Sequence, residues 1–233
     1  MVRGLLPESA NKKIEKLTMD NVFIPLVSSA EIEPKYNRAW KYIIERIGHD
    51  AKGDYLEFGV SHGSSLSCMH RVLKELKLND VRLFGFDSFE GMPESAANED
   101  GGVWKPGQFA SPIEFTRKLL TDRGVDWSRT FLIKGWFNET LTPETVKKHS
   151  ITKASVIMID CDIYSSSKAA LTFCVPLIKD LAIVFFDDWK DDKDFGEYKA
   201  FEEFLKENPQ FESEPFGDYA PTGKIFVVSK KAK

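Results

Sequence analysis

Acidic residues stand directly after several short apolar runs of this chain. These acids are Asp87, Asp160, Asp162, Asp187 and Asp188. Carboxylates that crowd together repel one another and raise each other's pKa unless a cation neutralises them. Ligand sets made only of oxygen favour a hard ion such as Mg²⁺, Ca²⁺ or Mn²⁺ over zinc. If a sheet brings these runs side by side, the sequence predicts a metal site. The alternative is a group of solvated loop acids, which suits the charged run 191–194 better than it suits Asp187.

A glycine-containing turn precedes the first of these acids. Glu57, Gly59 and Gly63 lie in the segment Glu-Phe-Gly-Val-Ser-His-Gly. Glycine lets a backbone approach a ligand closely, and a helix that begins here would offer free N–H groups. A third glycine at the spacing of the dinucleotide fingerprint is missing. Asp87 follows the next apolar run, where nucleoside-binding α/β proteins place an acid for the ribose hydroxyls. Turn and acid together favour an adenosine-containing cofactor; the alternatives are a plain strand-to-helix turn and an exposed or capping acid.

The elements that must position these residues alternate between two kinds. Apolar runs predict strands at 55–60, 81–86, 130–134, 155–159, 182–186 and 224–229. Helical spacing predicts helices at 35–47, 64–78, 113–123, 143–148, 166–178 and 197–207, with Ser165 or Ser166 capping the fifth. Residues 91–112, rich in Gly, Pro, Ser and Asn, are expected to form a long loop. Continuous apolar strands are buried on both faces, so an open, mostly parallel α/β sheet is expected, with its ligands at the carboxyl ends of the strands.

Length and composition exclude several classes of protein. The 233 residues carry a net charge of -4 and are 42% hydrophobic, which suits one domain with a full core. The charge gives no basic footprint for nucleic acid, and no apolar run is long enough to span a membrane. The N-terminal residues do not read as a signal peptide, and three cysteines fit a reduced compartment, so a cytoplasmic protein is expected. The apolar-rich N-terminal segment could pack against a second copy in a homo-oligomer.

Six segments of the chain resemble the macrocin O-methyltransferase family. They are 57–65, 86–93, 107–110, 134–141, 160–164 and 187–188. The resemblance implies a Rossmann-like class I methyltransferase fold, in which a mostly parallel seven-stranded sheet carries helices on both faces. Residues 1–50 would form an N-terminal helical cap and residues 51–233 the methyltransferase domain. The implied reaction transfers a methyl group from S-adenosylmethionine to a hydroxyl of a small-molecule acceptor, a sugar or a glycosylated natural product.

The resemblance also implies roles for individual residues. The cofactor would be bordered by Glu57, Gly59, Ser61, Gly63, Ser64, Asp87, Ser88, Gly135, Trp136, Phe137 and Asp160. Mg²⁺ would be bound by Asp160, Asp187 and Asp188. Asp162 would be the general base, and Asp160 would be the second catalytic residue. We further expect four aromatic side chains to form the acceptor wall: Tyr36, Trp40, Trp104 and Phe109.

Three other classes of protein share parts of this pattern. Asp160-Cys-Asp162 resembles the acid pair with which glycosyltransferases bind Mn²⁺ and a sugar nucleotide. Phosphatases that form an aspartyl phosphate also use an acid pair after a strand, although that pair normally follows the first strand. A cofactor-binding module without catalytic activity is the third alternative.

Overall fold

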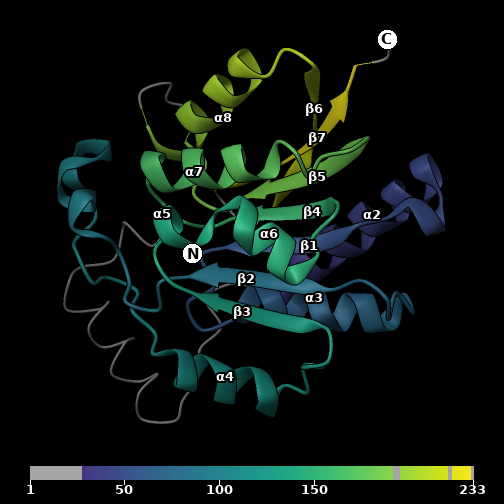
Figure 1. The fold of residues 1–233 in the computed structure, drawn as a ribbon, viewed down its shortest axis with the longest axis horizontal. Coiled ribbons are helices and arrows are strands. Elements are labelled where there is room, and N and C mark those ends of the chain that lie inside the picture. The colour runs from purple at the N-terminus through teal and green to yellow at the C-terminus, as the bar shows by residue number, and fades with distance from the viewer. Residues whose placement is uncertain (1–27, 191–194, 220–221, 232–233) are drawn as a thin grey trace.

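The computed structural model describes residues 28–190, 195–219 and 222–231. Its seven-stranded sheet has the order β3-β2-β1-β4-β5-β7-β6 (Figure 1). The strands are β1 (Asp54–Phe58), β2 (Leu83–Asp87), β3 (Thr130–Lys134), β4 (Ala154–Ile159), β5 (Leu181–Phe186), β6 (Phe211–Tyr219) and β7 (Gly223–Lys230). Strands β1 to β5 are parallel, whereas β7 is antiparallel to both β5 and β6. The predicted α/β class and mostly parallel sheet are confirmed.

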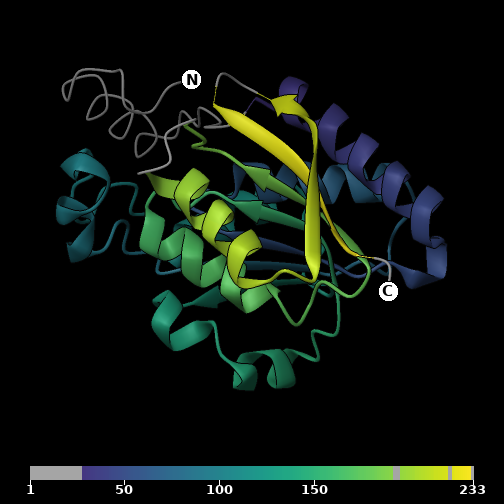
Figure 2. The ribbon, with the colours of Figure 1, turned by 90° about the horizontal axis from the view of Figure 1, so that it is seen from above.

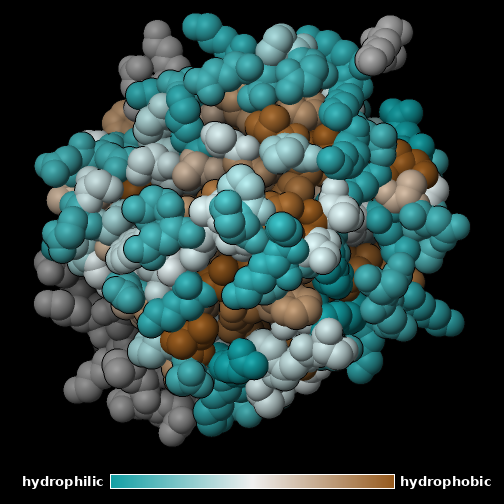
Figure 3. Space-filling view, in the orientation of Figure 1, coloured by the Kyte–Doolittle hydropathy of each residue, from teal (hydrophilic) through white to brown (hydrophobic). Residues whose placement is uncertain are grey.

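Helices cover both faces of the sheet. They are α2 (Ser29–Ile47), α3 (Ser64–Glu75), α4 (Ile113–Asp122), α5 (Phe137–Thr140), α6 (Pro143–His149), α7 (Tyr164–Cys174) and α8 (Gly196–Glu207). Helices α2 to α4 pack into one apolar cluster and α5 to α8 into the other (Figures 1 and 2). The outer surface of the α5–α8 face is hydrophilic over most of its area, with hydrophobic residues visible between the polar ones (Figure 3).

The strand β1 shows why the apolar runs are continuous. Tyr55 packs with the cluster of α2 and α3, while Leu56 and Phe58 pack with the cluster on the opposite face. All five residues of β1 are buried. Because side chains alternate between the two faces, a strand covered on both sides needs apolar residues at nearly every position.

Three elements differ from the sequence-based expectation. Strand β6 was not predicted because it lies at the sheet edge, buries only part of its residues and contains Pro215. Helix α5 is a single turn, too short to show a helical period. The expected loop 91–112 contains two short 3₁₀ helices, η2 (Glu94–Asn98) and η3 (Asp100–Gly102).

One face of helix α2, which includes Tyr36 and Trp40, belongs to the core. Tyr36 and Trp40 are completely buried, and the Tyr36 ring packs against Phe185 of the sheet. The prediction that these two aromatics form the acceptor wall is therefore wrong, because the apolar period of the helix that suggested them is satisfied by the sheet. The rest of the expected N-terminal cap, residues 1–27, lies outside the described residues.

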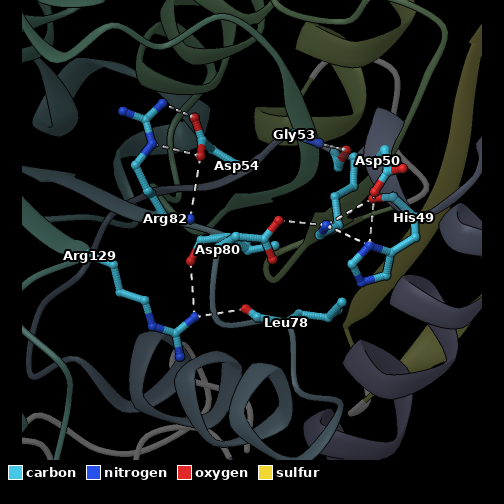
Figure 4. A network of polar contacts seen from close by, with 11 residues as sticks. His49, Asp50, Gly53, Asp54, Leu78, Asp80, Arg82 and Arg129 are labelled. Atoms are coloured by element: carbon cyan, nitrogen blue, oxygen red, sulfur yellow. Dashed lines mark hydrogen bonds and ion pairs between the residues drawn. The ribbon is translucent and has the colours of Figure 1, made fainter.

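Ion pairs stabilise the edge of the sheet where β1 and β2 begin (Figure 4). Arg82 donates from Nε to Asp54 Oδ1 over 3.0 Å, and its Nη1 donates to the carbonyl of His149. Beside them, Asp80 pairs with Lys52 at 2.7 Å. Acids at this edge are thus matched by basic side chains, a structural use of charge. The opposite edge, where the parallel strands end, carries the candidate site.

Candidate functional site

The three predicted metal ligands lie together. Asp160 follows β4, and Asp187 and Asp188 follow the neighbouring β5, whose Phe186 is in register with Ile159. One carboxylate oxygen from each of the three acids lies within 4.8 Å of the others. The sheet therefore gathers these acids as the sequence predicts, at a separation from which one ion could reach all three.

An open cavity, the glycine-turn cavity, lies next to this acid group, at the carboxyl ends of β1, β2 and β4. Nine of the predicted site residues line it: Gly59, Ser61, Asp87, Ser88, Gly135, Trp136, Phe137, Asp160 and Asp162. Phe109, expected in the acceptor wall, lines it as well. The cavity joins the glycine turn, the acid after β2 and the acids after β4 in one place.

Asp87 holds the glycine turn in position. Its Oδ2 accepts hydrogen bonds from the N–H groups of Val60 at 2.7 Å and Ser61 at 2.8 Å. Its Oδ1 accepts one from Phe89 N–H at 2.6 Å. Burial raises the pKa of this carboxyl above its ordinary value, although the three N–H donors act in the opposite direction. The acid therefore fixes the turn, and Oδ1, which accepts one of these hydrogen bonds, keeps a lone pair that a ligand hydroxyl can use.

Gly59 is required by the neighbouring strand. A Cβ atom at this position would lie 1.7 Å from the carbonyl oxygen of Asp160, and Gly59 has a φ of +88°. Only glycine avoids both the overlap and the backbone strain. The close approach brings the glycine turn after β1 directly against the acids after β4, and Asp160 N–H also donates to Phe58 O at 2.9 Å.

Glu57 is not part of the cavity lining. It is completely buried, and its carboxyl accepts hydrogen bonds from Tyr55 Oη at 2.5 Å and Ser65 Oγ at 2.6 Å. Burial raises the pKa of Glu57 to about 8, and the charges of Asp87 and Asp187 add to this. Gly63 and Ser64 also lie outside the lining of the cavity, so the predicted cofactor contacts of these three residues stay predictions. In the structure, Glu57 fixes the first turn of α3 through Ser65.

We expect Glu57→Gln to flatten the dependence of stability on pH. The ordinary pKa of 4.5 applies to the unfolded chain, so between 4.5 and about 8 the folded protein binds the proton that the unfolded chain has lost. The contribution of Glu57 to the free energy of unfolding is fully present below pH 4.5. It falls as the pH rises toward about 8, by about 1.4 kcal/mol per pH unit. Urea unfolding of both proteins between pH 5 and 8 measures the difference, with the exposed Glu45→Gln as control. Parallel pH profiles for wild type and Glu57→Gln would refute the assignment.

Asp162 lies between two cavities. It lines the glycine-turn cavity and also a smaller one, whose other lining residues are Asp100, Trp104, Asp188, Lys190, Phe195 and Gly196. Asp162 itself is 7% exposed, and its φ of +63° is unusual for a residue other than glycine. Ile163 N–H donates to Cys161 O at 2.7 Å, which makes Asp162 the centre of a strained three-residue turn. This turn places the Asp162 carboxyl between the glycine-turn cavity and the smaller cavity that Asp188 also lines.

Two residues of the site were not found from the sequence. Glu197, in the first turn of α8, is completely buried, and its Oε2 accepts a hydrogen bond from Asp188 N–H at 3.0 Å. Burial and the nearby acids, Asp188 first, raise the pKa of Glu197 well above its ordinary value. Tyr219, from the unpredicted strand β6, donates to Asp187 Oδ1 at 3.1 Å. Glu197 follows a charged run and reads as a surface residue, and Tyr219 could only be found by recognising β6.

The fold is that of class I O-methyltransferases. The O-methyltransferase NovP matches 86% of this chain and 79% of its own with a TM-score of 0.70 at 20% identity. The calicheamicin methyltransferase CalS11 matches 97% of this chain and 92% of its own with a TM-score of 0.65 at 18% identity. In the part of the chain that the structure describes, no helix has both the length and the apolar character needed to cross a membrane.

The chain belongs to the macrocin-O-methyltransferase (TylF) family, whose model matches residues 15–211. A tetracenomycin-C 4'-O-methyltransferase of Streptomyces olivaceus, which acts on the 8-demethyl-8-(2,3-dimethoxy-alpha-L-rhamnosyl) compound, is 30% identical over 65% of this chain. The demethyldecarbamoylnovobiocin O-methyltransferase of Streptomyces niveus is 27% identical over 61% of this chain. The matches span 59% and 55% of the length of these two relatives. S-adenosylmethionine is the cofactor of such methyltransferase families.

Proposed function

We propose that this protein is an S-adenosylmethionine-dependent O-methyltransferase that acts on a hydroxyl of a sugar or of a glycosylated natural product. The observation that carries the proposal is the single cavity that contains Asp87, the glycine turn and Asp160 and Asp162. The family match supports the reaction class, and the names of the relatives, which include a rhamnosyl-tetracenomycin methyltransferase, support the acceptor class.

The cofactor would occupy the glycine-turn cavity. Asp87 Oδ1 has a lone pair available for a ribose hydroxyl, and Oδ2 already fixes the turn at Ser61. Trp136 and Phe137 border the same cavity and would contact the adenine. When bound, S-adenosylmethionine supplies an electrophilic methyl group. The task of the chain is to align the acceptor oxygen with that methyl group, and orientation of this kind can lower the activation barrier by several kcal/mol.

The acids after β4 and β5 fit a hard divalent cation, and we propose Mg²⁺. Asp160, Asp187 and Asp188 would hold it, since they offer only oxygen ligands within 4.8 Å of one another. Beside them, Glu197 buries an oxygen, Oε1, that accepts no hydrogen bond from the described residues. Burial and the nearby acids raise the pKa of this carboxyl, and a bound cation would favour its ionised form. A cation bound here would orient the acceptor hydroxyls and lower the pKa of the reacting one.

Asp162 would then accept the proton of the acceptor hydroxyl on its carboxylate. This role is supported by the position of Asp162, which lines both the glycine-turn cavity and the smaller cavity of Trp104. The rings of Trp104 and Phe109 pack edge to face at 5.6 Å and would limit access of water from the side of residues 91–112. These contacts support a proposal in which residues at one edge of the sheet carry out binding, orientation and proton transfer.

The deciding experiment is an activity assay with S-adenosylmethionine, Mg²⁺ and a panel of rhamnosides, other deoxysugar glycosides and sugar nucleotides. Methylated product identified by mass spectrometry, together with calorimetric binding of S-adenosylhomocysteine, is the expected result. Tight binding of a sugar nucleotide without any binding of S-adenosylhomocysteine would favour the glycosyltransferase alternative. Binding of S-adenosylhomocysteine without turnover on any acceptor would favour the non-catalytic module.

We expect Asp87→Ala to weaken binding of S-adenosylhomocysteine by about 1–3 kcal/mol, because it leaves polar partners unpaired. The N–H groups of Val60 and Ser61 also lose their acceptor, so the variant should be less stable as well. Calorimetry measures the affinity, and a thermal unfolding curve confirms that the variant is folded at the temperature used. An unchanged affinity would remove Asp87 from the cofactor site.

A further inference from the structure

Two helices that begin at the site have no capping side chain of their own. The residue before α7 is Ile163 and the residue before α8 is Phe195, and neither makes a capping hydrogen bond with its side chain. The first N–H groups of a helix need acceptors, and a missing cap is costly. The sequence-based expectation that Ser165 or Ser166 caps the first of these helices is wrong, because α7 already begins at Tyr164.

Asp100 caps both helices from a distant part of the chain. Its Oδ2 accepts a hydrogen bond from Tyr164 N–H at 2.8 Å, and its Oδ1 accepts one from Gly196 N–H at 2.9 Å. The neighbouring Glu99 accepts from Ser165 N–H at 3.0 Å and from Ser165 Oγ at 2.9 Å. One carboxylate from the segment 91–112 therefore joins the beginnings of α7 and α8.

The backbone around Asp100 is strained, and the two bonds compensate for that strain. Asp100 has a φ of +47°, followed by Gly101 at +74° and Gly102 at +68°. A residue other than glycine costs energy in this left-handed conformation, and it persists only where the surrounding structure holds it there. The two N–H donors that point at its carboxylate provide such a hold.

The helix starts that Asp100 joins hold Asp162 from two sides. Tyr164 follows the strained turn that has Asp162 at its centre, where Ile163 N–H donates to Cys161 O. On the other side, a Cβ atom at Gly196 would lie 3.2 Å from the carbonyl oxygen of Asp162, so the beginning of α8 lies against the same turn. The N–H groups of Tyr164 and Gly196, which lie on either side of the turn, thus both donate to the carboxylate of Asp100.

We infer that Asp100 is a positioning residue for Asp162, which it orients by capping α7 and α8 together. The inference rests on the proposed function, in which Asp162 accepts a proton. It assigns to residues 99 and 100 a role that neither the glycine-turn cavity nor the acid group requires. Asp100 lines the smaller cavity together with Asp162 but is absent from the lining of the glycine-turn cavity, so cofactor binding should not depend on it.

Asp100→Asn is the decisive variant. Asparagine tolerates the left-handed conformation as aspartate does, so the change alters the cap and leaves the backbone requirement satisfied. Its side chain keeps one acceptor oxygen and places an NH₂ group against the second helix. We expect faster hydrogen exchange at the amides of Tyr164 and Gly196, by about fivefold or more. We expect kcat to fall between about tenfold and a hundredfold, because small misplacements of a reacting group are costly.

Two further variants complete the test. Glu94→Gln, an exposed acid of the same segment, should leave exchange and turnover as in the wild type. Glu99→Gln, which weakens the cap of α7 alone, should speed exchange at Ser165 but not at Gly196, with a smaller loss of kcat. If Asp100→Asn does not fold, Glu99→Gln carries the same test on one helix.

The outcomes separate the inference from the proposed function. Affinity for S-adenosylhomocysteine should stay within about twofold of the wild type in all three variants, given the tolerance expected for distant sites. Faster exchange with unchanged kcat would overturn the positioning role and leave Asp100 a structural cap. Unchanged exchange at Tyr164 and Gly196 would overturn the capping argument itself. A wild-type protein that methylates no acceptor would refute the proposed function, and the exchange measurement would still decide whether Asp100 orders the turn of Asp162.

Discussion

Asp162→Asn is expected to lower kcat by about 10²–10⁴-fold, the usual contribution of a general base. The asparagine side chain has the same shape but cannot accept the proton of an acceptor hydroxyl. Asp162 is 7% exposed and lines both cavities, so the change removes the carboxylate from the position where acceptor and cofactor would meet. Steady-state kinetics with labelled S-adenosylmethionine, at saturating acceptor, measures the effect.

The binding steps serve as internal controls for this variant. Affinity for S-adenosylhomocysteine should be retained, since Asp87 and the glycine turn are unchanged. The matched control is Asp50→Asn, an exposed acid of the 3₁₀ helix His49–Ala51, at the other edge of the sheet. A kcat for Asp162→Asn close to that of Asp50→Asn would show that another group takes the proton.

Removal of divalent cations is expected to abolish turnover and to lower thermal stability. The oxygens of Asp160, Asp187 and Asp188 that lie within 4.8 Å of one another repel when no cation is bound. A ligand that binds only the folded protein stabilises it by about 2.7 kcal/mol at a hundredfold excess over its Kd. Unfolding curves and rates measured in EDTA, and again after addition of Mg²⁺, test both effects.

Asp188→Asn separates loss of the cation from other effects of EDTA. The variant should need far more Mg²⁺ for turnover and show a smaller rise of the unfolding temperature on addition of Mg²⁺. Its affinity for S-adenosylhomocysteine should be close to that of the wild type. Full wild-type turnover in EDTA would exclude a role for a cation in the reaction, whatever the variant does.

The sheet and the acids at its edge could be predicted from the sequence. Parallel strands buried on both faces have a nearly pure apolar pattern, as in β4 and β5, and the residue after each strand must then lie at one common edge. For Asp160 and Asp187, position along the chain therefore determines position in the fold. This is why the predicted metal ligands and most of the predicted cavity residues lie together in the structure.

The remaining features depend on contacts that no local pattern records. Glu197 follows a charged run and reads as a surface acid, yet the packing of α8 buries it beside Asp188. The family resemblance implies that Glu57 borders the cofactor, and this stays a prediction. Alternation along β1 directs its side chain to the face of α2 and α3, where Tyr55 and Ser65 donate to it, a pairing that the strand pattern alone does not record. The caps of α7 come from residues more than sixty positions earlier in the chain, a pairing that only the tertiary fold creates.

The pairing of β1 with β4 has a consequence for the order of folding. Tyr55 of β1 pairs with Leu83 of β2 on one side and with Val156 of β4 on the other. The chain between β1 and β4 contains β2 and β3, so the pairing of β1 with β4 joins strands that are far apart in the sequence. Strands β1 to β3 and strands β4 to β7 each associate over shorter stretches of chain, and the pairing between the two halves closes the longest loop. Gly59 and Asp160 meet at that junction. The site is therefore assembled where two halves of the molecule join, and fragments divided between α6 and β4 should regain cofactor binding only when they associate.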